Sequence, residues 1–124
     1  MKVLLSIKPE FAKKIFEGEK KYEFRRTLFK NKEIKEVVVY ASSPVQKVIG
    51  KFEIDKILSE SIDDLWEETK FSSGIEESYY RKYFEGKENG FAIKIKKATM
   101  FKKEFDIQEK YGMKPPQSFA YIKK

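Results

Sequence analysis

Charged residues of both signs alternate in the segment 18–26, which reads Gly-Glu-Lys-Lys-Tyr-Glu-Phe-Arg-Arg. In an extended strand successive side chains point to opposite faces, so Lys21, Glu23 and Arg25 would share one face and Lys20 would lie on the other. Burying an unpaired charge is costly, so a face with a cation, an anion and a cation is either solvated or part of a site. In the solvated alternative, the lysines and the glutamate merely neutralise one another across an exposed strand.

The sequence contains neither histidine nor cysteine. It therefore lacks a thiolate nucleophile, an imidazole for acid–base catalysis, a Ser-His-Asp triad and the usual zinc ligands. Any chemistry must rest on Lys, Arg, Glu, Asp, Tyr, Ser or Thr, and we predict no metal site and no cofactor. The absence of cysteine also fits an intracellular protein.

A short helix is predicted directly before the charged segment, over residues 9–18. Pro9 suits the first turn of a helix, Glu10 lies near its positive end, and Gly18 ends it. Phe11 and Ile15 are four residues apart and form an apolar stripe that can pack on a core. Because this helix packs on the core and ends at Gly18, it fixes the position at which the charged strand, predicted over Lys20–Arg26, begins.

The remaining apolar patterns predict a mixed order of strands and helices. We expect further strands over residues 3–7, 37–41, 45–57, 91–96, 100–105 and 118–122. Helices are expected after Ser61, from about residue 75 or 76 to Phe84, and as a single turn over residues 108–111. Gly50 inside a strand indicates a bend, as at the corner of a barrel. With no βαβ rhythm and no glycine-rich phosphate loop, the predicted fold is α+β, a small mixed β-barrel of five to six strands with about three short helices.

Two capping boxes and an aromatic stripe are predicted in the acidic middle of the chain. Ser61 opens the first helix, and Ser73 stands in capping-box spacing before the second. Aromatic residues at helical spacing are more often core than a stacking platform. We therefore expect these side chains to pack the helices on the barrel: Trp66, Tyr79, Tyr83 and Phe84.

Length and charge narrow the class of protein. With 124 residues and 40% hydrophobic content the chain is expected to form one domain over residues 1–124, without a membrane span or a secretory signal, in the cytoplasm. The net charge of +7 divides into +6 over residues 1–32, +1 over 33–52, −6 over 53–88 and +6 over 89–124. If the terminal segments are neighbours, one face is strongly positive, which is typical of nucleic-acid binders.

Five segments together resemble the ASCH domain, a member of the PUA-like superfamily. They are residues 5–9 (Leu-Ser-Ile-Lys-Pro), 18–25 (Gly-x-Lys-x-x-Glu-x-Arg), 40–52 (Tyr-Ala-Ser-Ser-Pro, then Val-Ile-Gly-Lys-Phe), 91–93 (Phe-Ala-Ile) and 115–119 (Pro-Pro-Gln-Ser-Phe). The later segments are similar to a subgroup of largely stand-alone prokaryotic proteins, some of them described as predicted transcriptional regulators. The resemblance implies a pseudo-barrel with a cleft at one end, lined by the charged strand and by the loop after the strand at residues 37–41.

The resemblance implies RNA or modified nucleobases as ligands. We therefore predict first a PUA-like module that binds RNA or a nucleotide-like ligand and regulates transcription or translation. In this module Lys20 and Arg25 would hold phosphates or base acceptors, and Glu23 would accept from an exocyclic amine or orient the cations. The complete set of predicted ligand-binding residues is Lys8, Lys20, Lys21, Glu23, Arg25, Ser42 and Ser43.

Two other functions remain open. Some ASCH relatives remove the acetyl group from an acetylated cytosine nucleoside with a lysine that matches Lys20, a threonine placed where this chain has Glu23, and a later glutamate. Because that threonine is missing here, a hydrolase of a modified nucleoside or a ribonuclease would use Lys20 and Glu23 as its catalytic pair. The third hypothesis is a protein-interaction module. Strand alternation favours Lys21 as the partner of Glu23, whereas the family motif favours Lys20.

Overall fold

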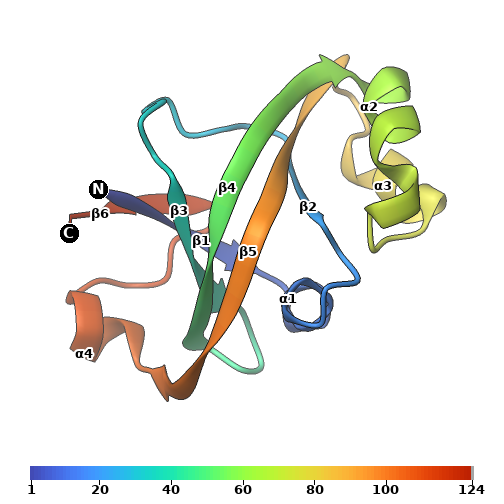
Figure 1. Ribbon diagram of the computed structural model, residues 1–124. Coiled ribbons are helices and arrows are strands. Elements are labelled where there is room, and N and C mark those ends of the chain that lie inside the picture. The colour runs from blue at the N-terminus through green and yellow to red at the C-terminus, as the bar shows by residue number, and fades with distance from the viewer. Residues whose placement is uncertain (124) are drawn as a thin grey trace.

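The computed structural model describes residues 1–123 and has the predicted α+β architecture (Figure 1). Its elements follow one another in this order: β1 (Lys2–Ile7), α1 (Pro9–Phe16), β2 (Tyr22–Arg25), β3 (Glu36–Ala41), β4 (Lys47–Ser61), α2 (Ile62–Thr69), the 3-10 turn η1 (Lys70–Ser72), α3 (Glu77–Tyr83), β5 (Asn89–Phe105), α4 (Ile107–Tyr111) and β6 (Phe119–Ile122). None of the helices in residues 1–123 is long and apolar enough to span a membrane.

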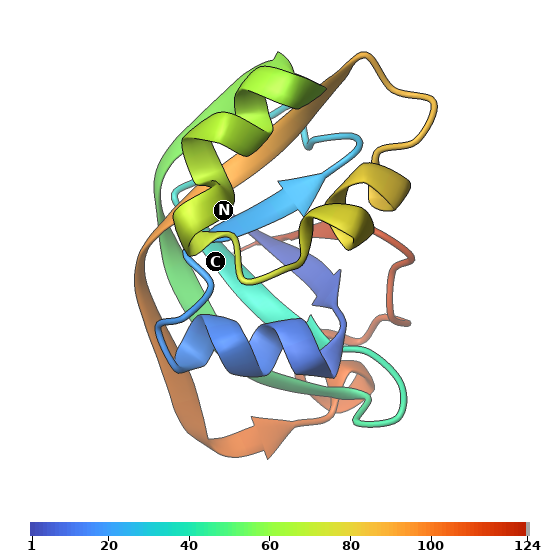
Figure 2. The ribbon, with the colours of Figure 1, turned by 90° about the vertical axis from the view of Figure 1, so that its right-hand side faces the viewer.

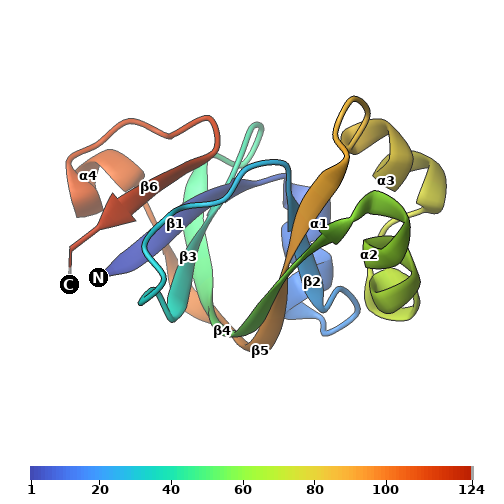
Figure 3. The same ribbon diagram turned by 90° about the horizontal axis from the view of Figure 1, so that it is seen from above.

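The strands form one mixed sheet in the order β2-β5-β4-β3-β1-β6. β1 runs parallel to β3, with Leu5 opposite Val39, and the other neighbours are antiparallel. Seen from above, the sheet curls round on itself (Figure 3). Within residues 1–123 no backbone pairing joins β2 to β6, so these strands are the two edges of the curled sheet. The pairing of β1 with β6 also makes the two basic terminal segments neighbours.

β4 and β5 are long, bent strands that carry most of the curl. β5 is continuous over residues where the sequence predicted two strands, because its pairing with β4 tolerates irregularities beside Gly50 and Ile54. The predicted bend at Gly50 is confirmed as one of these irregularities. A Cβ atom at Gly50 would lie 2.5 Å from Cζ of Phe16, so the glycine allows α1 to pack directly on the sheet.

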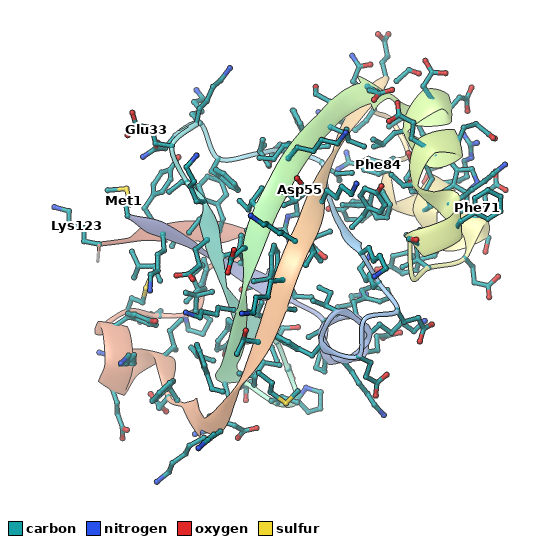
Figure 4. The ribbon with its side chains drawn as sticks, in the orientation of Figure 1. Met1, Glu33, Asp55, Phe71, Phe84 and Lys123 are labelled. Atoms are coloured by element: carbon teal, nitrogen blue, oxygen red, sulfur yellow. The ribbon has the colours of Figure 1, made fainter. Side chains whose placement is uncertain are left out.

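Three apolar clusters form the core. The largest lies inside the curl and includes Val37, Phe52 and Ile93, and a second lies under α4. The third holds α2 and α3 against β2, with Trp66, Tyr80 and Phe84 among its buried residues. Phe84 is labelled in Figure 4, where it lies between the helices and the sheet.

The prediction of the aromatic core was right for Trp66 and Phe84 and only partly right for Tyr79 and Tyr83. Both tyrosines are half-buried, and the buried tyrosine of α3 is Tyr80. The helix α3 has only seven residues, and Tyr80 lies on the side that faces the core, so Tyr79 and Tyr83 lie at the margin of the core rather than inside it.

Of the two serines predicted to cap a helix, Ser61 does so and Ser73 does not. The Ser61 hydroxyl accepts a hydrogen bond from the Asp64 amide at 3.2 Å and caps α2. The Ser73 hydroxyl instead donates to the carbonyl of Ile75 at 3.0 Å, and Glu76 caps α3 without a side-chain hydrogen bond. Ser73 lies in the tight connection after η1, where its hydroxyl satisfies local backbone groups.

Candidate functional site

A cleft of about 510 Å³ lies beside β2, between the start of α1 and α3. Figure 2 faces this side of the molecule and shows β2 above α1 and beside α3. Its walls come from both edges of the curled sheet, since β2 supplies Glu23 and Arg25 and the segment before β6 supplies Ser118. The cleft therefore lies at the gap between the two unpaired edges of the sheet, β2 and β6, which we call the seam.

Arg25 joins the two edges of the sheet across this seam. Its guanidinium donates to the Ser118 hydroxyl at 2.9 Å, to the Ser118 carbonyl at 3.2 Å and, more weakly, to the Ser6 carbonyl at 3.4 Å. It also donates to Oε2 of Glu23 at 2.9 Å, in an ion pair that leaves both residues less than 9% exposed. A planar fork of donors suits such a set of acceptors, and a lysine would not reach all of them. Arg25 thus closes the barrel and fixes the carboxylate of Glu23.

The two carboxylate oxygens of Glu23 differ in their partners. Oε2 is held by Arg25, whereas Oε1 has no hydrogen-bond partner within residues 1–123. No fully buried side-chain oxygen or nitrogen in that range lacks a partner, so Oε1 must be accessible, and the cleft is where Glu23 meets open space. An accessible carboxylate oxygen can accept a hydrogen bond or a proton from a bound molecule.

Lys20 is a buried cation in the same cleft. Only 3% of its surface is exposed, and its Nζ donates to the carbonyl of Ser73 at 2.9 Å. The Nζ also lies 4.8 Å from the ring centre of Phe24 and 5.5 Å from that of Phe11. Burial lowers the pKa of Lys20 from 10.5 to about 8, and the nearby charge of Glu23 offsets only part of this effect.

The neighbouring backbone is shaped around Lys20. Gly74 has a φ of +72°, and a Cβ atom there would lie 2.5 Å from Cβ of Lys20. Only glycine accepts both the left-handed conformation and this close approach. Residues 73–74 therefore form a wall that holds the lysine side chain in the cleft.

Aromatic side chains form the opposite rim. Tyr79 packs edge-on against Phe11 with ring centres 5.1 Å apart, and Nζ of Lys8 lies 5.4 Å from the Tyr79 ring centre. Tyr83 donates its hydroxyl to the carbonyl of Phe24 at 3.1 Å, and burial raises its pKa. The rim thus offers a ring face next to an exposed lysine, a combination that suits a flat ligand carrying negative charge.

Five of the predicted site residues line the cleft and two do not. Lys8, Lys20, Glu23, Arg25 and Ser42 lie around it, whereas Lys21 and Ser43 are exposed and are not among its lining residues. The alternation argument for Lys21 failed because regular pleating begins only at Tyr22. Before that point the backbone of Lys21 bonds to Ser72 and Ile95, which turns Lys20 toward the cleft.

The remaining lining residues were not predicted as part of a site. They are Ser6, Ile7, Phe11, Phe24, Arg26, Thr27, Ile75, Tyr79, Tyr83, Gln117 and Ser118. The only signal in the sequence was the segment 115–119, which supported the family resemblance without a role of its own. In residues 1–123 no group of three or more acidic side chains is placed to hold a metal ion.

The fold and the cleft define an ASCH domain, and comparison with known proteins agrees. The family model "ASCH domain" matches residues 5–99, so the chain belongs to this family and the resemblance of its motifs is confirmed. The chain is 31% identical over 125 residues to the "ASCH domain-containing ribonuclease" of Zymomonas mobilis, and the match covers 98% of this chain and 84% of the relative.

Two other comparisons bear on the fold and on the extent of the chain. A crystal structure of ASCH from Zymomonas mobilis superposes with a TM-score of 0.91 at 30% identity, over 99% of this chain and 88% of that one, which confirms the predicted fold class. The large ribosomal subunit protein uL22 of Ureaplasma parvum is 32% identical over 122 residues, covering 98% of this chain. The chain spans only 39% of the length of that relative.

Proposed function

We propose that this protein binds single-stranded RNA in the cleft and cleaves it, with Lys20 and Glu23 as the catalytic residues. The observation that carries the proposal is a buried lysine with a pKa of about 8, beside a carboxylate with one accessible oxygen, in an open cleft. Groups whose pKa lies near the working pH make efficient proton donors and acceptors. The name of the Zymomonas relative supports RNA cleavage rather than binding alone.

The two residues have complementary roles in the proposed reaction. Oε1 of Glu23 takes the proton from a ribose 2′-hydroxyl, whose oxygen attacks the adjacent phosphorus. The ammonium of Lys20 gives a proton to the 5′-oxygen as its bond to phosphorus breaks. The products are a 2′,3′-cyclic phosphate and a free 5′-hydroxyl, and no water, metal ion or covalent intermediate is needed.

Other residues of the cleft bind and orient the RNA. A base stacks on the rim formed by Tyr79 and Phe11, and Lys8 approaches the phosphate. The positive charge of Lys8 stabilises the charge that develops on the phosphate oxygens. Arg25 acts through Glu23, as a positioning residue, because its Nη1 and Nη2 atoms already donate to Glu23 and Ser118.

The test is cleavage of a fluorescent single-stranded RNA by the wild type and by Lys20→Gln and Glu23→Gln. Each substitution should slow cleavage by about 10²- to 10⁴-fold, which is the usual contribution of a general acid or base. Lys21→Gln is the matched control, since this exposed neighbour lies outside the cleft, and it should cleave like the wild type. A substrate with one 2′-deoxy nucleotide should resist cleavage at that position.

Each alternative function gives a different result. RNA that is bound but never cleaved by the wild type would leave only a binding module, and deacetylation of acetylated cytidine would identify a nucleoside hydrolase. Variants of Lys20 and Glu23 that cleave within about twofold of the Lys21 control would remove these residues from the mechanism.

A further inference from the structure

A second groove, of about 730 Å³, lies on the other side of the segment that follows β2. We name it the lysine groove, and its lining residues are Leu28, Phe29, Lys30, Asn31, Lys32, Ile34, Lys35, Ile54, Asp55, Lys56, Ile57, Ser59 and Phe91. One wall is the connection between β2 and β3, and the other is the bent middle of β4. In Figure 3 this connection crosses from one half of the curled sheet to the other.

The charge of the lysine groove is strongly positive. Four of its residues are exposed lysines that form no ion pair within residues 1–123, namely Lys30, Lys32, Lys35 and Lys56. Its one acidic residue, Asp55, faces Nζ of Lys94 at 3.8 Å. Like charges gathered without partners repel one another, so the groove favours an anionic occupant.

The backbone that carries these lysines is held firmly in place. The hydroxyl of Tyr121 on β6 accepts hydrogen bonds from the amides of Lys30 and Asn31, at 2.9 and 3.0 Å. At the far end, the amide of Ile54 donates to the carbonyl of Lys35 at 2.9 Å. Phe29 is buried between these points. Fixed positions for the cations reduce the entropy cost of binding an anion.

The floor of the groove is apolar. Half-buried side chains of Leu28, Ile54, Ile57 and Phe91 lie between the lysine-bearing walls. A row of phosphates with bases that turn toward an apolar surface matches this arrangement, since single strands bind through a basic groove and stacked or apolar base contacts. A duplex, with its bases paired inside, does not use such a floor.

The groove adjoins the cleft, both along the chain and across the sheet. Thr27 lines the cleft and the next residue, Leu28, lines the groove. Across the sheet, Arg25 in the cleft pairs with Phe91 in the groove. A single strand with one nucleotide in the cleft would therefore pass over the end of β2 into the groove.

We propose that the lysine groove is a second binding site for single-stranded RNA, which holds the nucleotides that flank the one in the cleft. This proposal rests on the proposed function and extends it to the length of the substrate. It makes the protein selective for RNA several nucleotides long over dinucleotides and free nucleosides.

The test compares two quadruple variants of equal charge. In the groove variant, Lys30, Lys32, Lys35 and Lys56 become glutamine, and in the control the exposed lysines outside both sites do so, namely Lys96, Lys97, Lys102 and Lys103. Affinity is measured by fluorescence anisotropy with an RNA of about 12 nucleotides, within the usual range of site sizes for single strands. The same RNA is used over a salt series, with a dinucleotide as the short reference.

We expect the groove variant to bind the long RNA at least tenfold more weakly. Its salt slope should fall by up to about 3, at about 0.7 for each phosphate that the protein no longer neutralises. The control variant should keep both values, and the ratio of long to short affinity should collapse only in the groove variant. Equal losses in both variants, or no loss in the groove variant, would overturn the proposal. Tighter binding of an acidic peptide than of RNA, abolished only in the groove variant, would overturn it in favour of a protein partner.

Failure of the groove is distinguishable from failure of the proposed function. If the wild type neither binds nor cleaves RNA, the proposed function itself is wrong. If the wild type cleaves and depends on Lys20, but the groove and control variants bind the long RNA alike, only the groove proposal fails.

Discussion

Replacing Lys20 with methionine should make the protein less active but, at neutral pH, no less stable. Methionine has a similar length and no charge, so it fills the space between the rings of Phe11 and Phe24 without a buried ammonium. It leaves the carbonyl of Ser73 without its hydrogen bond, which costs about 1–3 kcal/mol. It also removes the free-energy cost of burying the charge of Lys20, and the lowering of the Lys20 pKa measures this cost.

The magnitude and sign follow from linkage. Burial lowers the pKa of Lys20 from 10.5 to about 8 in the folded protein. Between these values the unfolded chain holds the proton and the folded protein does not, so stability rises with pH in this window. The full effect is roughly 3 kcal/mol, at 1.36 kcal/mol per pKa unit, and about 2–3 kcal/mol of it appears between pH 7 and pH 10. Below pH 8 both states are protonated and the cost is present in full.

The assay is urea denaturation of the wild type and Lys20→Met at several pH values from 7 to 10. Other lysines and tyrosines titrate alike in both proteins, so the difference in unfolding free energy isolates Lys20. We expect the advantage of the methionine variant to shrink by about 2–3 kcal/mol over this range. Lys14→Met is the control, because it removes a lysine hydrogen bond to the adjacent carbonyl of Gly74 from a more exposed position. A difference that stays constant within about 0.5 kcal/mol would refute the argument that this lysine is desolvated.

Other predictions concern the core, the wall of the cleft, the hydrogen bonds by which Arg25 joins the sheet edges, and the reaction. Trp66→Ala should cost about 3–5 kcal/mol in chemical denaturation, and a loss below about 1 kcal/mol would mean that α2 is not packed as described. Gly74→Ala should destabilise by more than about 1 kcal/mol and slow cleavage, because its methyl group would displace Lys20. Arg25→Lys should cost about 2–4 kcal/mol in the same assay, since a lysine cannot reach Ser118 and the carboxylate together, and an unchanged midpoint would contradict the role of Arg25 in joining the two edges of the sheet. If Lys20 donates a proton, kcat/KM, which reports the free protein, should fall as pH rises through about 8, whereas a value that rises there would make Lys20 the base.

The elements of the fold were largely predictable because their signals are local. Pro9 begins α1 because it has no amide donor to leave unsatisfied, and Ser61 precedes α2 because its hydroxyl accepts from the Asp64 amide. Gly18 follows the end of α1 with a φ of +84°, a conformation that glycine adopts readily. The join of the two predicted strands into β5 was not predictable from the chain itself. It depends on irregular pairing with β4, and Gly50 was the only sign of it.

The site was predictable in type but not in geometry. The family motif placed Lys20 in the cleft correctly, whereas strand periodicity chose Lys21 because it assumed that pleating starts before Tyr22. The contact between Arg25 and Ser118 spans 93 positions, and no pattern within either segment encodes it. Contacts that close a sheet depend on how far it curls, which is decided by packing along its whole length.

Arg25 both holds the two edges of the sheet together and balances the charge of Glu23 in the cleft. Arg25 satisfies acceptors on both edges of the sheet and at the same time neutralises Glu23, so the pair adds no net charge to the cleft. Lys20 is then the buried charge that remains without an ion pair at close range in residues 1–123, and near pH 7 it is mostly protonated. A buried cation with no matching anion is unfavourable in the free protein and is relieved when a phosphate arrives. Under the proposed function, the burial that lowers the pKa of Lys20 would strengthen its attraction for an RNA phosphate, and the ion pair of Glu23 with Arg25 would hold the carboxylate in position to accept a proton.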